Sequence, residues 1–185
     1  MSVPQPAQPA KLVVGAIFKQ RALLGTAVDA LTRAFGPLDL VSPWFSFDYT
    51  EYYAREMGSP LYRRVLVFEN LISQEALVEV KLRTNALEQA LSNQGARPVN
   101  LDPGYLLLER FVLATGKNYS HRIYLGQGIY ADLTLIYQQG NYRTLPWTYP
   151  DYASPELQGF LLKARSKYRR DLAAATKTPV LPDKE

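Results

Sequence analysis

The stretch KLVVGAIF, residues 11–18, and the pattern that follows it decide the expected fold. The stretch is short, apolar and rich in β-branched residues, which predicts a buried strand. From Leu23 to Phe35, apolar residues recur at three- and four-residue spacing, which predicts an amphipathic helix. Gly36-Pro37 ends this helix, because glycine accepts a left-handed turn and proline cannot continue it. The folded part therefore begins with a strand and a helix.

The next segments repeat this alternation. Strands are predicted at residues 38–47, where Pro43 indicates an edge or a bulge, and at residues 63–68. A second helix begins after Ser73, which can cap it, and its apolar stripe runs from Leu77 to Leu91. The opposite, solvent-facing side of this helix is expected to carry Lys81, Asn85 and Glu88.

The C-terminal half predicts more strands and one more helix. Residues 97–102 and 105–115 are extended by composition, and residues 121–125 and 129–137 form a hairpin around a Gly-Gln-Gly turn. The last helix begins at Ser154-Pro155-Glu156, where a capping residue precedes a proline in the first helical position.

The order strand-helix-strand-strand-helix-strand, with an added hairpin and helix, predicts an α+β fold. We expect a mixed sheet with a ferredoxin-like βαββαβ core, extended by the C-terminal hairpin and helix. One domain should span residues 11–175. The segments 1–10 and 176–185 are rich in proline or polar residues, so we expect disordered tails there.

The composition excludes several kinds of chemistry. The chain of 185 residues has no cysteine, which rules out disulfides and thiolate nucleophiles and favours a cytoplasmic location. It has no apolar run long enough for a bilayer, so no membrane partner is expected. With one histidine, no metal site can use two imidazoles, and we predict no metal site. No cofactor is identified, because the pattern GQGIYA at residues 126–131 lacks the helix that dinucleotide binding needs.

One polar constellation lies in the predicted hairpin. If Leu125 pairs with Ile129, then Tyr124 faces Tyr130 and Arg122 faces Asp132 on one polar side. A ligand-binding hypothesis follows, in which a basic clamp holds a phosphate or carboxylate and tyrosine rings stack on the ligand. Its residues are Lys117, Arg122, Tyr124 and Tyr130. The alternative is an exposed cross-strand ion pair between Arg122 and Asp132, worth under about 1 kcal/mol.

Catalytic candidates are few. Asp132 could act as a general base, and His121 is the single imidazole. Strand alternation places His121 on the apolar face opposite Leu133, unless a bulge changes its side. A histidine there is more often a core residue than a catalyst.

The last helix is basic, which gives a second hypothesis. Lys163, Arg165, Lys167 and Arg169 could bind RNA together with exposed aromatic residues, although no RNA-binding motif is present. The alternative is an ordinary solvated helix face. A third hypothesis is a protein-interaction module without chemistry of its own.

Four short sequence motifs carry a resemblance to a known family. They are YYAREMG (residues 52–58), RPVNLDPGY (97–105), SHRIYL (120–125) and WTYPDY (147–152). With them the chain resembles a bacterial family described only as a domain of unknown function, number 4416. The resemblance implies a bacterial cytoplasmic protein and no particular activity. Our leading hypothesis is a domain that binds a small anionic or nucleotide-like ligand, with or without enzymatic activity.

Overall fold

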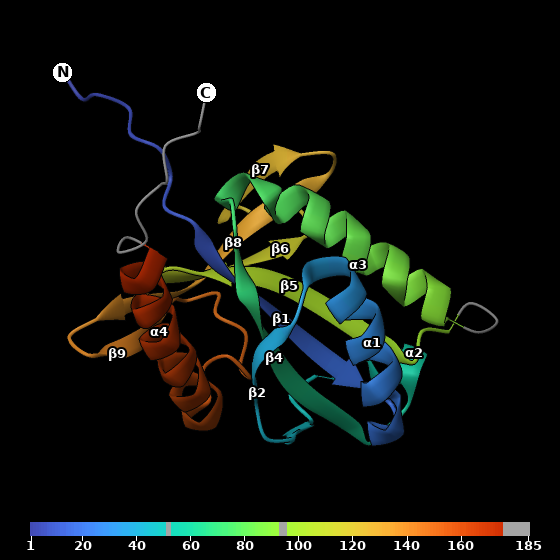
Figure 1. Ribbon diagram of the computed structural model, residues 1–185. Coiled ribbons are helices and arrows are strands. Elements are labelled where there is room, and N and C mark those ends of the chain that lie inside the picture. The colour runs from blue at the N-terminus through green and yellow to red at the C-terminus, as the bar shows by residue number, and fades with distance from the viewer. Residues whose placement is uncertain (51–52, 93–95, 176–185) are drawn as a thin grey trace.

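The computed structural model describes residues 1–50, 53–92 and 96–175, so the expected tail at 176–185 lies outside the described residues. Figure 1 shows the elements. In chain order they are β1 (Ala10–Phe18), α1 (Leu24–Phe35), β2 (Leu38–Val41), β3 (Phe45–Phe47), α2 (Ala54–Met57), β4 (Leu61–Ile72), α3 (Leu77–Leu91), β5 (Val99–Leu106), β6 (Arg110–Thr115), β7 (Arg122–Gly126), β8 (Ile129–Gln138), β9 (Asn141–Thr144) and α4 (Pro155–Ala175). The predicted α+β class is confirmed.

The strands form one nine-stranded sheet. Its order is β2-β4-β1-β5-β6-β8-β7, with β3 beside β4 and β9 beside β8. Every pairing between the described strands is antiparallel, so the predicted mixed sheet is wrong. The reason is that β1 and β2, which run in the same direction on either side of α1, are separated by the antiparallel strand β4.

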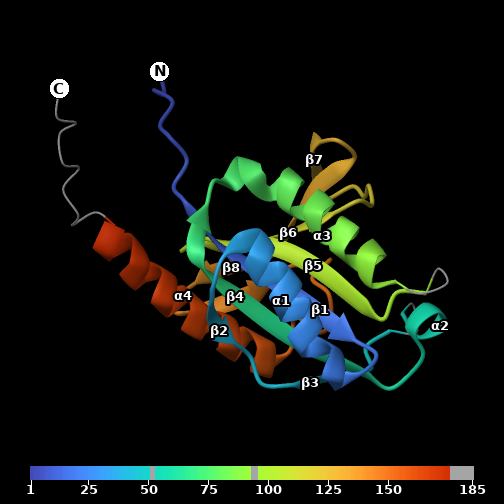
Figure 2. The same ribbon diagram turned by 45° about the vertical axis from the view of Figure 1, so that its right-hand side comes forward.

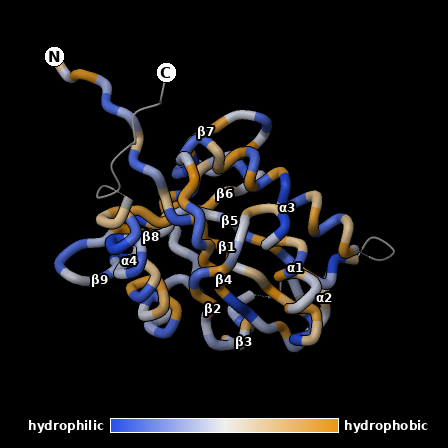
Figure 3. Tube along the Cα trace, in the orientation of Figure 1, coloured by the Kyte–Doolittle hydropathy of each residue, from blue (hydrophilic) through white to orange (hydrophobic). Residues whose placement is uncertain are grey.

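The two faces of the sheet have different covers. Leu12, Val14 and Ala16 of β1 point to the core under α1 and α3, whereas Val13 belongs to the core under α4. Figure 2 shows α1 and α3 side by side on one face, and α4 crosses the other. The hydrophobic stretches follow the central strands, while the turn between β8 and β9 is hydrophilic (Figure 3). Because α4 covers only part of its face, loops cover the remainder.

Pro43 divides the second predicted strand. The structure has β2 before it and β3 after it, and both pair with β4. Between them the backbone N–H of Ser42 donates to the Val65 carbonyl. This agrees with the expected irregular edge, because proline cannot donate to a strand ladder.

Two charged residues of α3 hold the free edge of β5. Strand β6 pairs only with Gly104–Leu106, so among the described strands none pairs with the first half of β5 on that side. Glu88 Oε1 accepts from the Leu101 N–H, and Lys81 Nζ donates to the Leu101 carbonyl at 3.0 Å. Both side chains are buried. Their predicted solvent-facing position is therefore wrong, because backbone groups of β5 need partners there.

A buried lysine joins α4 to the sheet. The Lys11 side chain of β1 is fully buried, and its Nζ lies 2.6 Å from a carboxylate oxygen of Asp39 and 2.6 Å from one of Asp171. Lys167 of α4 contacts the same two carboxylates. Burial raises the pKa of both aspartates, but the hydrogen bonds from the two lysines outweigh it. The net pKa of each lies below its ordinary value of 3.8.

This cluster predicts a loss of stability in acid. A carboxylate whose pKa is lowered by folding stabilises the fold above its unfolded pKa, and this contribution is lost as the pH falls through the folded pKa. We therefore expect the free energy of unfolding, measured with urea, to fall below about pH 4. Lys11→Met should flatten this fall, because the aspartates then lose their main partner. Parallel curves for wild type and Lys11→Met would contradict the assignment.

Candidate functional site

A loop between β9 and α4 builds the site. Trp147 Nε1 donates to the Leu133 carbonyl at 2.8 Å, and Thr148 Oγ1 donates to the Thr134 carbonyl at 2.6 Å. These carbonyls lie on β8 between the residues that pair with β7 and those that pair with β9. The loop is thus attached to the sheet, and it carries residues 149–152 across the part of the face that α4 leaves open.

The loop meets a buried arginine. Arg63 of β4 is 2% exposed and forms an ion pair with Asp151, which is also buried. Its guanidinium carbon lies 4.5 Å from the centre of the Tyr152 ring. A Cβ at Gly15 would lie 2.5 Å from Arg63 Nη2 and 2.8 Å from the Tyr152 hydroxyl. Glycine at position 15 therefore provides the space in which the guanidinium lies against the sheet.

The Arg63 guanidinium is enclosed beside the Tyr152 hydroxyl. Its Nε and Nη2 atoms are buried, and Nη2 and the Tyr152 hydroxyl both lie next to Gly15. Burial raises the pKa of Tyr152, and Arg63 partly counteracts this. Burial alone would lower the pKa of Arg63, but Tyr152, Asp151 and Asp102 raise it, so the guanidinium stays charged. Burial raises the pKa of Asp151, which Arg63 partly counteracts.

A pocket of about 290 Å³ opens onto this pair. One wall comes from β3 and the residues beside it, and the other from the start of α4. The lining residues are Trp44, Phe45, Ser46, Asp48, Tyr49, Arg63, Asp151, Ser154, Glu156 and Leu157. Such a volume lies at the lower end of the range for small-molecule sites. The pocket therefore combines a buried cation, exposed carboxylates and apolar side chains.

The predicted hairpin forms a second polar cluster, which shares no residue with the lining of the pocket. Arg122 faces Asp132 and Tyr124 faces Tyr130, as predicted. Ile129 pairs with Gly126 and not with Leu125, because the ladder shifts after Tyr124. Arg122 donates to Asp132 at 2.9 Å, to the Tyr149 hydroxyl at 2.6 Å and to the Lys117 carbonyl at 2.9 Å.

The burial of this cluster differs from expectation. The side chains of Arg122 and Asp132 are 4% and 1% exposed, so the alternative of an exposed ion pair is wrong. Ile123 and Leu125, on the apolar side of β7, are exposed. The part of the polar side that carries Arg122 and Asp132 is covered by the loop at 145–152, whereas Tyr124 on the same side is exposed.

His121 lies on this polar side. Its Nε2 is 3.4 Å from Asp132 Oδ2, and its ring is stacked on Trp147 with centroids 4.8 Å apart. Its predicted position on the apolar face opposite Leu133 is wrong, because β7 begins only at Arg122 and residue 121 belongs to the preceding turn. The structure therefore brings His121, Arg122 and Asp132 together.

The remaining predicted residues are dispersed. Tyr124 and Tyr130 contact each other, with ring centroids 5.2 Å apart, and Tyr124 is exposed near the end of the hairpin. Lys117 is exposed in the loop before it. These three side chains do not line the pocket.

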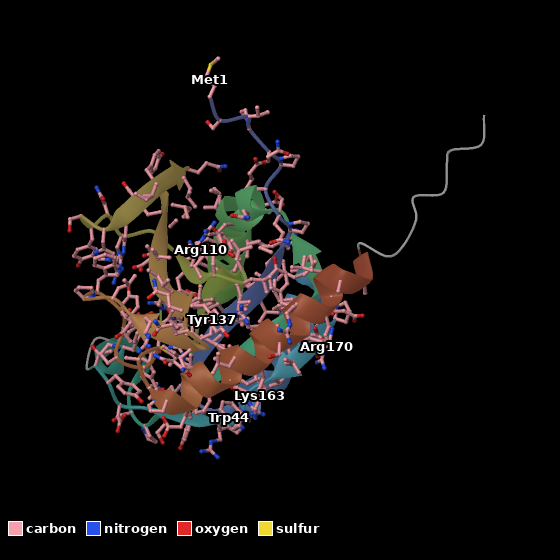
Figure 4. All side chains as sticks on the ribbon, turned by 90° about the vertical axis from the view of Figure 1, so that its left-hand side faces the viewer. Met1, Trp44, Arg110, Tyr137, Lys163 and Arg170 are labelled. Atoms are coloured by element: carbon pink, nitrogen blue, oxygen red, sulfur yellow. The ribbon has the colours of Figure 1, made fainter. Side chains whose placement is uncertain are left out.

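The basic helix is partly engaged in internal contacts. Arg165 donates to the Leu108 carbonyl at 2.7 Å and lies over the Tyr137 ring. Lys167 pairs with Asp39 and Asp171. Lys163 and Arg169 are exposed on the outer side of α4, and Figure 4 shows Lys163 there.

Sequence reasoning missed Arg63. A signal was present, because Arg63 lies on the same side of its strand as the apolar residues Val65 and Val67. Asp151 was part of the word WTYPDY, but no role was assigned to it. Within the described residues, no three histidine or acidic side chains are grouped so that they could hold a metal ion.

Three of the four segments that carry the resemblance contribute residues that lie near Asp102. Tyr53, Asp102, Tyr149 and Asp151 come from three of them, and the charge of Asp102 affects the pKa of the other three.

The described part of the chain contains no helix that is long and apolar enough to cross a membrane. No curated protein and no solved structure is significantly similar to the chain. A family model described as "Domain of unknown function (DUF4416)" matches residues 8–168, which is most of the sequence. The chain therefore belongs to the DUF4416 family.

Proposed function

We propose that the protein binds a small anionic ligand in the pocket at Arg63. The observation that carries this proposal is a charged guanidinium, paired with Asp151, in the lining of a pocket. A ligand carboxylate or phosphate in the pocket would be attracted by this charge. Hydrogen bonds between arginine and such groups are stronger than those between neutral groups.

The first turn of α4 supports the same ligand chemistry. Ser154, Glu156 and Leu157 line the pocket, so this helix of 21 residues directs its N-terminal end toward it. The positive end of a helix dipole favours an anion. The N–H groups of Leu157 and Gln158 already donate to Ser154, and Pro155 has none, so the N–H of Glu156 is the donor left in this first turn.

The hairpin is the alternative location for the ligand. Arg122 already donates to Asp132, Tyr149 and Lys117. These contacts favour a supporting role, in which Arg122 positions Tyr149 and the loop that carries Asp151. Binding by Lys117, Arg122, Tyr124 and Tyr130 remains a prediction that the same experiment tests. The contacts of Arg165 and Lys167 leave fewer free cations on α4 for RNA.

Thermal-shift and calorimetric titrations with phosphate, sulfate, carboxylates, amino acids and nucleotides test the proposal. At least one anion should raise the melting temperature of the wild type through mass action. Arg63→Met should weaken its binding tenfold or more, since hydrogen bonds to a charged group are lost. Ser46→Phe, which fills the pocket from its exposed rim, should have the same effect and leave the ion pair of Arg63 intact.

The controls distinguish the two locations. Arg143→Gln, on the surface of β9, should leave binding unchanged. Loss of binding in Lys117→Gln or Tyr124→Ala, but not in Ser46→Phe, would place the ligand on the hairpin. No response of the wild type to any anion would refute the proposal.

We also infer a ferredoxin-like arrangement for the unit from β1 to β5. The strand order β2-β4-β1-β5 and the position of α1 and α3 on one face support this assignment.

A further inference from the structure

The charges around the pocket restrict the ligand further. Arg63 is the one cation among the lining residues, and three carboxylates accompany it. Asp151 is paired with Arg63. Asp48 and Glu156 are exposed, and neither forms an ion pair with the described residues. The pocket thus has a positive floor and a negative rim.

An ion with negative charge alone fits this arrangement poorly. Its charge would be attracted by Arg63 and by the N-terminus of α4, but Asp48 and Glu156 would repel it at short range. A polyphosphate would meet this repulsion along its whole length. A ligand that carries an ammonium group beside its carboxylate satisfies both parts, because the ammonium supplies the donors that the two rim carboxylates can accept.

The apolar lining contributes a third requirement. Trp44, Phe45 and Leu157 line the pocket together with the polar residues, and Tyr49 adds an aromatic ring at its exposed side. These side chains can bury an aliphatic or aromatic group of a ligand. A volume of about 290 Å³ suits a ligand of a few to about a dozen non-hydrogen atoms.

We propose that the ligand is a free α-amino acid with an apolar side chain. Arg63 and the first turn of α4 hold its carboxylate, Asp48 and Glu156 hold its ammonium group, and Phe45 and Leu157 contact its side chain. This inference rests on the proposed function, since it assigns the anion at Arg63 to one end of a zwitterion.

Matched ligands test the inference by isothermal titration calorimetry. Leucine, methionine, phenylalanine and tyrosine are each compared with the acid that lacks the amino group and the amine that lacks the carboxylate. For at least one set, the amino acid should bind tenfold or more tighter than both analogues. The full-length wild-type protein is used throughout.

Two variants separate the ends of the ligand. The double variant Asp48→Asn/Glu156→Gln should reduce the affinity for the amino acid to that for its deaminated acid, and it should not weaken the acid. Arg63→Met should weaken the binding of both the amino acid and the deaminated acid, but not the binding of the amine. Glu79→Gln, an exposed acidic residue on α3, is the matched control and should change neither affinity.

The outcomes distinguish this inference from the proposed function. If the deaminated acids or phosphate bind the wild type as tightly as the amino acids, the proposal of a zwitterionic ligand is refuted. The proposal of anion binding at Arg63 then still holds. If the double variant leaves the preference for the amino acid unchanged, the rim does not hold the ammonium group and the inference fails. If no carboxylate, phosphate or amino acid binds, both proposals fail.

Discussion

Replacing Arg122 with glutamine should lower the free energy of unfolding by about 3–5 kcal/mol. Arg122 and Asp132 face each other across β7 and β8, and their side chains are 4% and 1% exposed. Without the guanidinium, a buried carboxylate loses its charge partner, and the nearby His121 contact at 3.4 Å compensates only in part. Tyr149 also loses its donor, which loosens the loop that carries Asp151. Urea denaturation at pH 7 measures the change.

A double variant shows whether the cost comes from the unpaired charge. Arg122→Met/Asp132→Leu replaces both partners with apolar groups, which is often nearly neutral at a buried pair, so it should recover most of the lost stability. Arg143→Gln on the surface should change stability by less than about 0.5 kcal/mol. A cost below about 1 kcal/mol for Arg122→Gln would mean that the pair behaves as an exposed one.

Gly104→Ala should lower the free energy of unfolding by about 3 kcal/mol, the upper end for an overpacked site. A Cβ at position 104 would overlap with the Val112 carbonyl oxygen and lie 3.0 Å from Leu113 Cδ2. The first of these atoms belongs to the backbone of β6, so it cannot move without shifting the strand. The described strands β5 and β6 pair only across Gly104–Leu106, so this shift would weaken the joint between the two halves of the sheet.

Gly25→Ala is the control, and it should change the free energy of unfolding in the opposite direction. A Cβ at Gly25 of α1 would meet nothing within 4 Å. Alanine is favoured over glycine in a helix by roughly 0.5–1 kcal/mol, so this variant should be slightly more stable than the wild type. Thermal and urea denaturation of both variants compare the two sites. Equal stability of Gly104→Ala and wild type would show that β5 and β6 can separate enough to accept the methyl group.

Local patterns were sufficient for most of the elements. The spacing of apolar residues in KLVVGAIF and in the segment up to Phe35 predicted β1 and α1, and Pro43 marked the break between β2 and β3. Two cross-strand pairs of the hairpin were also predicted, since side chains alternate with a period of two. Strand β9 was not predicted, because its four residues are mostly polar and lack a repeated pattern.

The candidate site was predicted only in fragments. Asp132 and Arg122 were named from their alternation, but Arg63 was not, although the residues on its side of β4, Leu61 and Val65, are apolar. Lys81 and Glu88 were assigned to solvent because charged residues on a helix are usually exposed. Their burial depends on β5, whose free edge needs a donor and an acceptor at Leu101.

Local sequence was enough to assign most residues within a strand or helix to a shared face, because the periods of 2.0 and 3.6 follow from backbone geometry. His121 is an exception, because it precedes the first residue of β7. Which face is covered depends on contacts between distant segments. The Arg122–Asp132 pair on the polar side of the hairpin is buried because Trp147 and Thr148 attach a distant loop to β8, whereas Ile123 and Leu125 of β7 stay exposed. The Arg122–Asp132 pair was predicted correctly, but the exposed pair considered from the sequence would lie in water, whereas the observed pair lies in a medium of lower dielectric constant. Contacts between segments far apart in the chain therefore decide how much stability the pair affects. An exposed pair would contribute under about 1 kcal/mol. Removing one partner of a buried pair costs about 3–5 kcal/mol.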